Sequence, residues 1–403
     1  MSSLLQRPSK DSTVSSQTND HTPKLIFICD FIKPGNVNVP EYQRAKILTQ
    51  RFRTAIIYRW GIPDDIRGEC EEVYRVRGRV LAILYGFLLV LYLRVVKGYE
   101  IVYTGPNIFA IMWGSLAKSL LGCTWIFDLW DHPSLELASA HPLSALAKKP
   151  LYRMFLQRKP VDADAWIIGM HMGVLDFLPA SYPKRKILHV TNGIVLSPIE
   201  SMRRHETEVR EGQRDKVLNV CYAGPITAWR GMRVLLEGLE ALSTEYRIRV
   251  ELFGERDDEI LLAIEDHNRV SPHEIRYHGY LPHKEALAKL AQSEVCLCIL
   301  DTSVVSFRYA YAVKIFEYLA LGKVIVATRT TASSEIIRDG DNGFLISFSA
   351  ESLRMVFERI IEMKEKGDLV RVERAARESA KLYRWEDINE KVVSHLHTVL
   401  KDM

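Results

Sequence analysis

The sequence predicts an α/β protein made of two doubly wound, Rossmann-like domains. In both halves of the chain, short apolar runs rich in β-branched residues alternate with stretches of helical periodicity. A strongly charged segment without such periodicity, residues 197–216, indicates a linker between the halves. The 403 residues are enough for two such domains. Because domains of this class bind ligands at the carboxyl ends of their strands, we expect a ligand cleft between the two sheets.

The N-terminal half opens with a strand, a loop and a helix. Residues 24–29 are an apolar run and residues 42–52 have helical periodicity, but the loop between them contains one glycine, too few for a G-x-G-x-x-G fingerprint. A further helix is predicted over residues 108–121. Further strands are predicted over residues 54–58, 100–103, 124–127, 165–169 and 187–190.

Two polar residues, Asp131 and His132, follow the predicted strand 124–127. Since ligands of parallel α/β sheets collect beyond the carboxyl ends of strands, we expect both side chains to take part in chemistry. The structural alternative is that Asp131 caps the next helix and His132 is merely solvated.

An uncharged run of fourteen residues, Val80–Leu93, is bracketed by basic residues: Arg75, Arg77, Arg79, Arg94 and Lys97. The run is too short to span a bilayer, which takes roughly 20 apolar residues. Two interpretations remain open: a helix buried between layers, or a helix lying in a membrane face with its arginines at lipid phosphates.

Charge and composition limit the classes of partner that the sequence predicts. The net charge of +4 is modest and no nucleic-acid-binding motif is present, so we expect no nucleic acid partner. Residues 24–195 hold 22 Lys and Arg against 14 Asp and Glu, which makes this half the candidate for an anionic partner or membrane. The polar residues 1–23 have no apolar signal-peptide core and predict a disordered tail, so we expect a cytoplasmic protein.

No metal site is predicted. The six cysteines are scattered without a CxxC pair, which favours reduced thiols. Asp162–Asp164 and Asp339–Asp341 each spell DxD, but the first precedes a strand and the second is a glycine-bearing turn, where Asp serves the backbone.

The C-terminal half repeats the strand–loop–helix pattern. A strand over 217–223 leads into the loop Gly224–Gly231, which contains Arg230, and then into a helix through Leu242. A helix is also predicted over 284–292. Further strands are predicted over residues 249–253, 276–278, 295–300, 324–327 and 344–346.

A helix followed by a buried strand is predicted within Ala312–Thr328. Lys314 and Glu317 lie three residues apart near the start of that helix, so both can point the same way. A helix N-terminus that carries a cation suits an anion, phosphate above all.

Three ordered motifs of this half resemble the retaining glycosyltransferases of family 4, which have the GT-B fold. They are the glycine loop at 224–231, KIFEYLALGK at 314–323 and SSEIIRDGDNGFLI at 333–346. DLWDH at 128–132 and Thr191–Gly193 are similar to family segments of the N-terminal domain. The resemblance implies an acceptor-side domain over 24–196, a nucleotide-sugar-binding domain over 217–382, and a C-terminal helix, 383–403, that packs back on the first domain.

The resemblance also implies roles for individual residues. Glu317 matches the second glutamate of the family's E-x7-E motif, which contacts the donor ribose, and Arg230 matches the basic residue that neutralises the donor diphosphate together with Lys314. Gly224 and Glu335 complete the donor-binding set. Asp131 and His132 align with the segment that lies against the sugar and acceptor.

Two positions depart from the family pattern. Tyr309 stands where the first glutamate of E-x7-E is expected, and Pro225 stands where an arginine often follows the first glycine. Both departures also occur in the branch with a KIFEYLALGK-type motif, whose members build surface polysaccharides.

The sequence therefore predicts a retaining hexosyltransferase that needs no metal or other cofactor. It would move a sugar from a nucleoside diphosphate to a hydroxyl of a lipid-linked or polysaccharide acceptor, in the cytoplasm or at the inner face of the cytoplasmic membrane. Two alternatives remain: a catalytically degenerate subunit that binds nucleotide sugar or scaffolds a partner transferase, and a sugar-nucleotide epimerase of the same fold.

Overall fold

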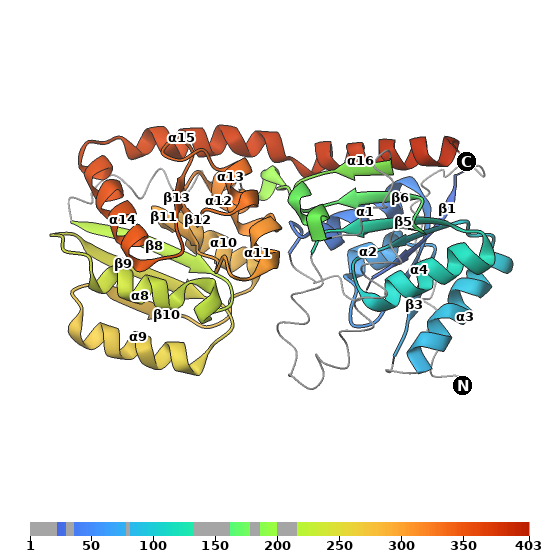
Figure 1. Cartoon of the computed structure of the whole chain (residues 1–403), viewed down its shortest axis with the longest axis horizontal. Helices are drawn as coiled ribbons and strands as arrows, with labels where there is room; N and C mark the ends of the chain where they lie inside the picture. The colour runs from blue at the N-terminus through green and yellow to red at the C-terminus, as the bar shows by residue number, and fades with distance from the viewer. Residues whose placement is uncertain are drawn as a thin grey trace.

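The computed structural model describes residues 22–29, 36–77, 81–131, 162–177, 186–199 and 216–402. It contains two parallel sheets, each covered by helices on both faces (Figure 1). This architecture confirms the predicted pair of doubly wound domains. Most of the predicted tail, most of the predicted linker, Arg79 and His132 lie outside the described residues.

The N-terminal sheet has the strand order β3-β2-β1-β4-β5-β6-β7, and all its pairs are parallel. Its strands are β1 (Lys24–Ile28), β2 (Arg53–Tyr58), β3 (Glu72–Arg75), β4 (Ile101–Thr104), β5 (Thr124–Leu129), β6 (Ala165–Ile168) and β7 (Ile187–His189). The helical elements described are α1 (Pro40–Arg51), α2 (Asp64–Glu69), α3 (Leu81–Val95), α4 (Ile108–Leu121) and η2 (Met172–Phe177).

The C-terminal sheet has the order β10-β9-β8-β11-β12-β13 and is also parallel. Its strands are β8 (Val217–Ala223), β9 (Arg247–Phe253), β10 (Glu274–Tyr277), β11 (Val295–Cys298), β12 (Val324–Thr328) and β13 (Phe344–Ile346). The helical elements are η4 (Ala228–Arg230), α8 (Met232–Glu240), α9 (Asp258–Val270), α10 (His283–Gln292), α11 (Val305–Tyr309), α12 (Val313–Leu321), α13 (Thr331–Ile336), α14 (Ala350–Glu365), α15 (Leu369–Ala380), η5 (Lys381–Tyr383) and α16 (Trp385–Lys401).

The C-terminal helix α16 crosses back to the N-terminal domain, as expected, and runs along the same side of the molecule as α15 (Figure 1). Its apolar face, including Trp385, Ile388 and Val392, packs in one core cluster with α1 and the N-terminal strands. A buried ion pair lies at this junction: Arg44 Nε is 2.8 Å from Asp128 Oδ2, and Arg44 also donates to Asn389 of α16. The chain's last helix therefore belongs to the core of its first domain.

Several elements were not predicted. The strand β3 was missed because Glu72–Arg75 is a short, half-buried segment without an apolar run. The helices α2, α9, α11, α13, α14 and α15 were not predicted either. The apolar run Val80–Leu93 forms most of α3. One face of α3 is buried against α4 and the other face is exposed, so the helix is not covered on all sides. The interpretation that it lies in a membrane face stays a prediction.

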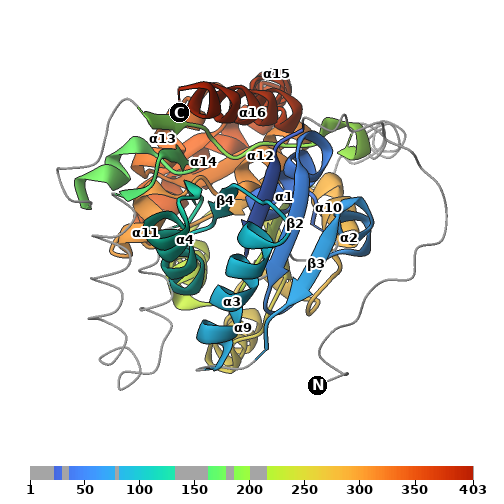
Figure 2. The ribbon, with the colours of Figure 1, turned by 90° about the vertical axis from the view of Figure 1, so that its right-hand side faces the viewer.

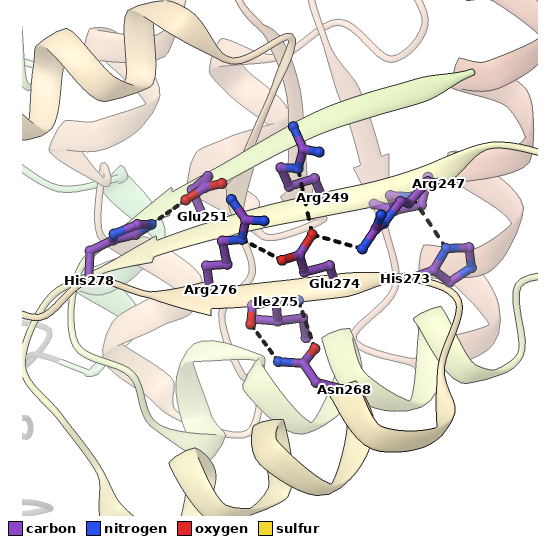
Figure 3. A network of polar contacts seen from close by, with 10 residues as sticks. Arg247, Arg249, Glu251, Asn268, His273, Glu274, Ile275, Arg276 and His278 are labelled. Carbon is purple, nitrogen blue, oxygen red and sulfur yellow. Dashed lines mark hydrogen bonds and ion pairs between the residues drawn. The ribbon is translucent and has the colours of Figure 1, made fainter. Parts of the chain in front are cut away.

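The outer edge of the C-terminal sheet is covered by charged side chains (Figure 3). Glu274 of β10 accepts a hydrogen bond from Arg247 of β9 at 3.0 Å and also pairs with Arg276. Burial alone would raise the pKa of Glu274, but the hydrogen bond from Arg276 and the charges of Arg276, Arg247 and Arg249 hold it below its usual value. Such charged side chains discourage an edge strand from pairing with another chain.

All six cysteines lie in described segments and are free thiols, and five of them are buried. No helix of the described segments is long and apolar enough to cross a bilayer.

Candidate active site

Lys314 lies in the first turn of α12 and points toward the carboxyl end of β8. Its Nζ atom is 4.1 Å from the centroid of the Tyr222 ring. The atom is buried and has no hydrogen-bond partner among the described residues. No side chain caps the start of α12 either, so this helix end presents an ammonium group together with uncapped backbone N–H groups. Such an arrangement is suited to bind an anion.

The protonation of Lys314 reflects this environment. Its pKa is lowered to about 8, mainly by burial; the nearby Arg230 charge contributes to the lowering, whereas Cys298 and Glu317 act in the opposite direction. A bound anion would raise the pKa of Lys314 again and favour the charged ammonium form. Lys314 is therefore a cation whose compensating charge is still to be supplied.

Glycines bring the backbone close to Lys314. A Cβ atom on Gly224 would lie 2.7 Å from Lys314 Nζ, and Gly224 has a φ of +149°. On the next strand, a Cβ atom on Gly254 would lie 1.8 Å from the carbonyl oxygen of Gly224. Side chains at these two positions would fill the space beside the ammonium group or push the strand ends apart.

Arg230 is the second cation of this region. It closes the short η4 turn, and its guanidinium carbon lies 4.5 Å from the centroid of the Phe307 ring. It is close enough to Lys314 to lower that residue's pKa. Gly231 lets the turn lie close to the residue that follows β11: a Cβ atom on Gly231 would lie 2.2 Å from Ile299. The structure thus brings together three predicted donor-site residues, Gly224, Arg230 and Lys314.

Glu317, the fourth predicted donor residue, is buried and lies where the two domains meet. Its Oε1 accepts a hydrogen bond from Asn38 Nδ2 at 3.1 Å and lies 2.6 Å from His283 Nε2. Asn38 comes from the N-terminal domain; its own Oδ1 accepts from the Val195 backbone, and its carbonyl accepts from Trp385. The Glu317 carboxylate is therefore held in place from both domains.

Glu335 belongs to a different group of side chains at the domain junction. It accepts a hydrogen bond from Tyr311, whose hydroxyl also lies 3.2 Å from His189 Nε2, and it lies 3.9 Å from His171. No hydrogen bond or ion pair between described residues joins this group to Lys314 or Arg230.

Tyr309, which stands where the resemblance led us to expect a glutamate, packs across the same domain junction. Its carbonyl accepts a hydrogen bond from the His171 backbone at 2.8 Å, and its ring would lie 2.7 Å from a Cβ atom on Gly173. The ring thus has a packing role against the N-terminal domain.

Asp131 lies beyond β5, next to Trp130 and near Glu41 of α1. The Trp130 ring fits against Gly105, where a Cβ atom would lie 2.4 Å from the ring. Burial raises the pKa of Glu41 to about 7; the Asp131 and Asp128 carboxylates add to this effect, and hydrogen bonds from its own backbone and from Trp130 oppose it. A carboxyl group that titrates near neutrality beside Asp131 can accept or return a proton at physiological pH. His132 lies outside the described residues, so its position beside this pair stays a prediction.

The DxD segments use their carboxylates within the fold. Asp164 accepts a hydrogen bond from the Trp125 backbone and pairs with Lys118. Asp339 accepts from the Leu345 backbone and lies 3.1 Å from Arg329. Among the described residues, no group of three or more His, Cys, Asp or Glu side chains is arranged to hold a metal ion.

Sequence reasoning did not identify Asn38, His283 and Glu41. Each follows a strand in a connecting segment or begins a helix, which is where ligand-facing residues collect in such sheets. Their positions after strands were a usable signal. Which of the many polar loop residues would face Glu317 or Asp131 depends on how the two domains pack.

Comparisons with known proteins bear on the family and the fold. Residues 218–363 match the family described as glycosyl transferases group 1. No curated protein sequence matches the chain.

Several solved structures share the architecture of almost the whole chain. A glycosyltransferase from Rickettsia africae is similar with a TM-score of 0.70 and 15% identity, covering 95% of this chain and 100% of that one. HepE of Anabaena, in complex with UDP, is similar with a TM-score of 0.68 and 13% identity, covering 93% of this chain and 100% of that one. Sucrose-phosphate synthase of Thermosynechococcus elongatus is similar with a TM-score of 0.72 and 14% identity, covering 94% of this chain and 100% of that one. The chain thus has the GT-B fold, and the match to the glycosyl transferases group 1 family is confined to residues 218–363.

Proposed function

We propose that the protein is a retaining, metal-independent hexosyltransferase. It moves a hexose-type sugar from a nucleoside diphosphate to a hydroxyl of a lipid-linked or polysaccharide acceptor. The observation that carries this proposal is the buried ammonium group of Lys314, which has no hydrogen-bond partner among the described residues and lies near Arg230. A buried charge is unfavourable unless an opposite charge completes the site, and a diphosphate supplies that charge.

The donor fits the chemistry of this region. HepE of Anabaena has been solved with UDP and with UDP-glucose, and this chain shares its fold. We expect the diphosphate to lie between Lys314, Arg230 and the first turn of α12, with Gly224 leaving room for it. Glu317 then receives the ribose hydroxyls, positioned by Asn38 and His283. Glu335 extends the donor-binding set as a polar contact near the domain junction.

The reaction breaks the bond between the sugar's anomeric carbon and the diphosphate oxygen. Negative charge grows on the departing diphosphate, and two fixed cations near it stabilise the transition state more than the ground state. The acceptor oxygen attacks from the face that the diphosphate leaves, so the anomeric configuration is retained. The acceptor proton passes to a departing phosphate oxygen. Lys314, Arg230 and the helix N-terminus take the place of a metal ion in this scheme.

The acceptor side is assigned to the N-terminal domain. Asp131 and His132 orient the sugar and the acceptor hydroxyl, and Glu41, whose pKa is raised to about 7 by burial and in part by Asp131, can take up or release a proton beside them. A lipid-linked acceptor places the protein in the cytoplasm, in peripheral contact with the inner face of the cytoplasmic membrane.

Calorimetry of the full chain with a panel of nucleoside diphosphates and their sugars tests the donor site. We expect submillimolar binding of at least one member, and a loss of roughly 10²-fold or more in affinity in Lys314→Met, because charge-assisted contacts to phosphate are the strong ones. Lys289→Met, a change at an exposed lysine of the same domain, is the matched control and should bind as the wild type does. Failure of every nucleotide to bind the wild type would overturn the proposal.

Turnover separates this function from the degenerate-subunit alternative, which Tyr309 at the first glutamate position favours. Transfer to an acceptor in the presence of a chelator supports the metal-independent enzyme. Strict dependence on a divalent ion contradicts that part of the proposal. Binding without transfer over a panel of donors and acceptors supports a nucleotide-binding subunit, and isomerisation of the donor without acceptor supports an epimerase.

A further inference from the structure

Helix α3 exposes a continuous apolar face. Leu84 is 60% exposed, Leu88 48%, Tyr92 39% and Val95 70%. These residues are four, four and three positions apart, so they lie in one row along the helix. Val96, just beyond the helix, and Leu120, at the end of α4, are each 66% exposed. An exposed apolar surface of this extent marks an interaction site.

The opposite face of α3 is firmly packed. Leu89, Val90 and Leu93 are buried in a core cluster shared with α4. A Cβ atom on Gly86 would lie 2.1 Å from the Trp113 ring, so the two helices approach closely. α3 lies at the end of the N-terminal domain that is farthest from the C-terminal domain (Figures 1 and 2). The apolar row is thus a fixed outer surface and belongs to neither the domain junction nor the donor site.

Basic and amphipathic side chains lie at the end where α3 begins. Arg75 and Arg77 are exposed, and Arg75 donates hydrogen bonds to the backbone carbonyls of Arg59 and Trp60 at 3.3 Å each. The Arg59 guanidinium lies over the ring of Trp60, whose side chain is 65% exposed. At the other end of α3, Arg94 and Lys97 are paired with Glu100 and Glu72. The positive charge is therefore concentrated beside the first turn of the helix.

We propose that this face of α3 docks the protein onto an anionic lipid bilayer. The apolar row enters the boundary between headgroups and acyl chains, while Arg75 and Arg77 meet lipid phosphates and Trp60 and Tyr92 lie at headgroup level. A helix of 15 residues is about 22 Å long, so it lies in the plane of the membrane and does not cross it. A second copy of this chain fits less well, because a symmetric contact would bring the same arginines together.

This docking specifies the surface for the membrane contact included in the proposed function, and it requires no catalysis. Cosedimentation with vesicles therefore tests it in the absence of donor and acceptor. Loss of nucleotide binding would leave docking intact, and loss of docking would leave nucleotide binding intact, so the two failures are distinguishable.

The full chain is mixed with vesicles of phosphatidylcholine and phosphatidylglycerol, or of phosphatidylcholine alone. We expect binding to the anionic vesicles, and a roughly tenfold or greater loss of partitioning in Leu84→Glu/Leu88→Glu, because two apolar side chains are replaced by charges. Arg75→Gln/Arg77→Gln should lose roughly tenfold or more and should bind with a weaker salt dependence. Leu262→Glu changes an equally exposed leucine, 63%, on α9 of the other domain and should bind as the wild type does.

The proposal is overturned if the wild type stays in solution with anionic vesicles, or if Leu84→Glu/Leu88→Glu binds them as strongly as Leu262→Glu does. Sedimentation velocity without lipid tests whether a second copy of the chain covers this face instead. A wild-type dimer that Leu84→Glu/Leu88→Glu converts to monomer would assign the face to a second copy of the chain and would also overturn lipid docking. The melting temperatures of all variants should match the wild type, since the changed side chains are already exposed.

Discussion

Each domain buries a cation near the carboxyl end of its sheet, and the two cations differ in whether a hydrogen-bonded partner compensates the charge. Arg44 in the N-terminal domain is paired with Asp128, which also accepts a hydrogen bond from Tyr103, and it donates to Asn389. Lys314 in the C-terminal domain has an aromatic ring beside it but no hydrogen-bond partner among the described residues. A compensated buried charge serves the fold, whereas an uncompensated one is kept where a ligand will supply the missing charge.

The Arg44 pair also explains how the two domains are tied together. The guanidinium joins α1, β5 and α16, so a buried polar network anchors the first turns of the helix that crosses back from the C-terminal domain. Burial and the neighbouring Asp128 carboxylate raise the pKa of Tyr103 well above its usual value, so Tyr103 remains a hydrogen-bond donor. By contrast, the Lys314 ammonium group makes no hydrogen bond to any described residue of either domain.

The largest effect is expected for Arg44→Met. Removing the cation leaves the Asp128 carboxylate buried without its partner, so the free energy of unfolding should fall by about 3–5 kcal/mol. Urea denaturation followed by circular dichroism measures it. Arg51→Met removes an exposed ion pair between the same two helices, with Glu390, and should cost less than about 1 kcal/mol. Equal losses in the two variants would show that burial of the Arg44 pair does not matter.

The second effect is expected for Lys314→Met, where function and stability should move in opposite directions. Turnover should fall roughly 10²-fold to 10³-fold, because a group that stabilises the departing diphosphate is lost. The free energy of unfolding at pH 7 should rise, by on the order of 1–3 kcal/mol, because burial of an ammonium group is removed. Initial rates at saturating donor and urea denaturation measure the two quantities. A stability loss like that of Arg44→Met would contradict the assignment of Lys314 as an uncompensated charge.

The smallest effect is a pH dependence of nucleotide affinity that only the uncompensated cation can produce. In the free protein the pKa of Lys314 is about 8, and a bound diphosphate stabilises its charged form. Affinity should therefore be constant below pH 8 and weaken up to about tenfold per pH unit above it, because binding then requires proton uptake.

The neighbouring groups do not imitate this slope. Burial raises the pKa of both Cys298 and Tyr222, so these two remain neutral over this range. Calorimetry of nucleoside diphosphate binding between pH 7 and pH 9 measures the slope, with about one decade of change expected. Lys314→Met should bind weakly and without the slope. If the slope persists in this variant, a group other than Lys314 is responsible for the pH dependence.

Local sequence determined the elements and the spacing of residues within them. The helix predicted over residues 108–121 and the strands over 217–223 and 344–346 have the predicted bounds, because apolar periodicity and the stop at Gly122 are local signals. The spacing of Lys314 and Glu317 placed both on one helix for the same reason.

Tertiary packing decided what those residues meet. Asn38 reaches Glu317 from 279 positions away in the chain, and Tyr309 packs against a helix of the other domain. The sequence of Val80–Leu93 gave two interpretations because an apolar helix looks alike whether one face or all faces are covered. Which face of α3 is covered depends on α4, and which cation is compensated depends on where Asp128 lies. Contacts between residues far apart in sequence are set by how the layers pack, and no local pattern contains that information.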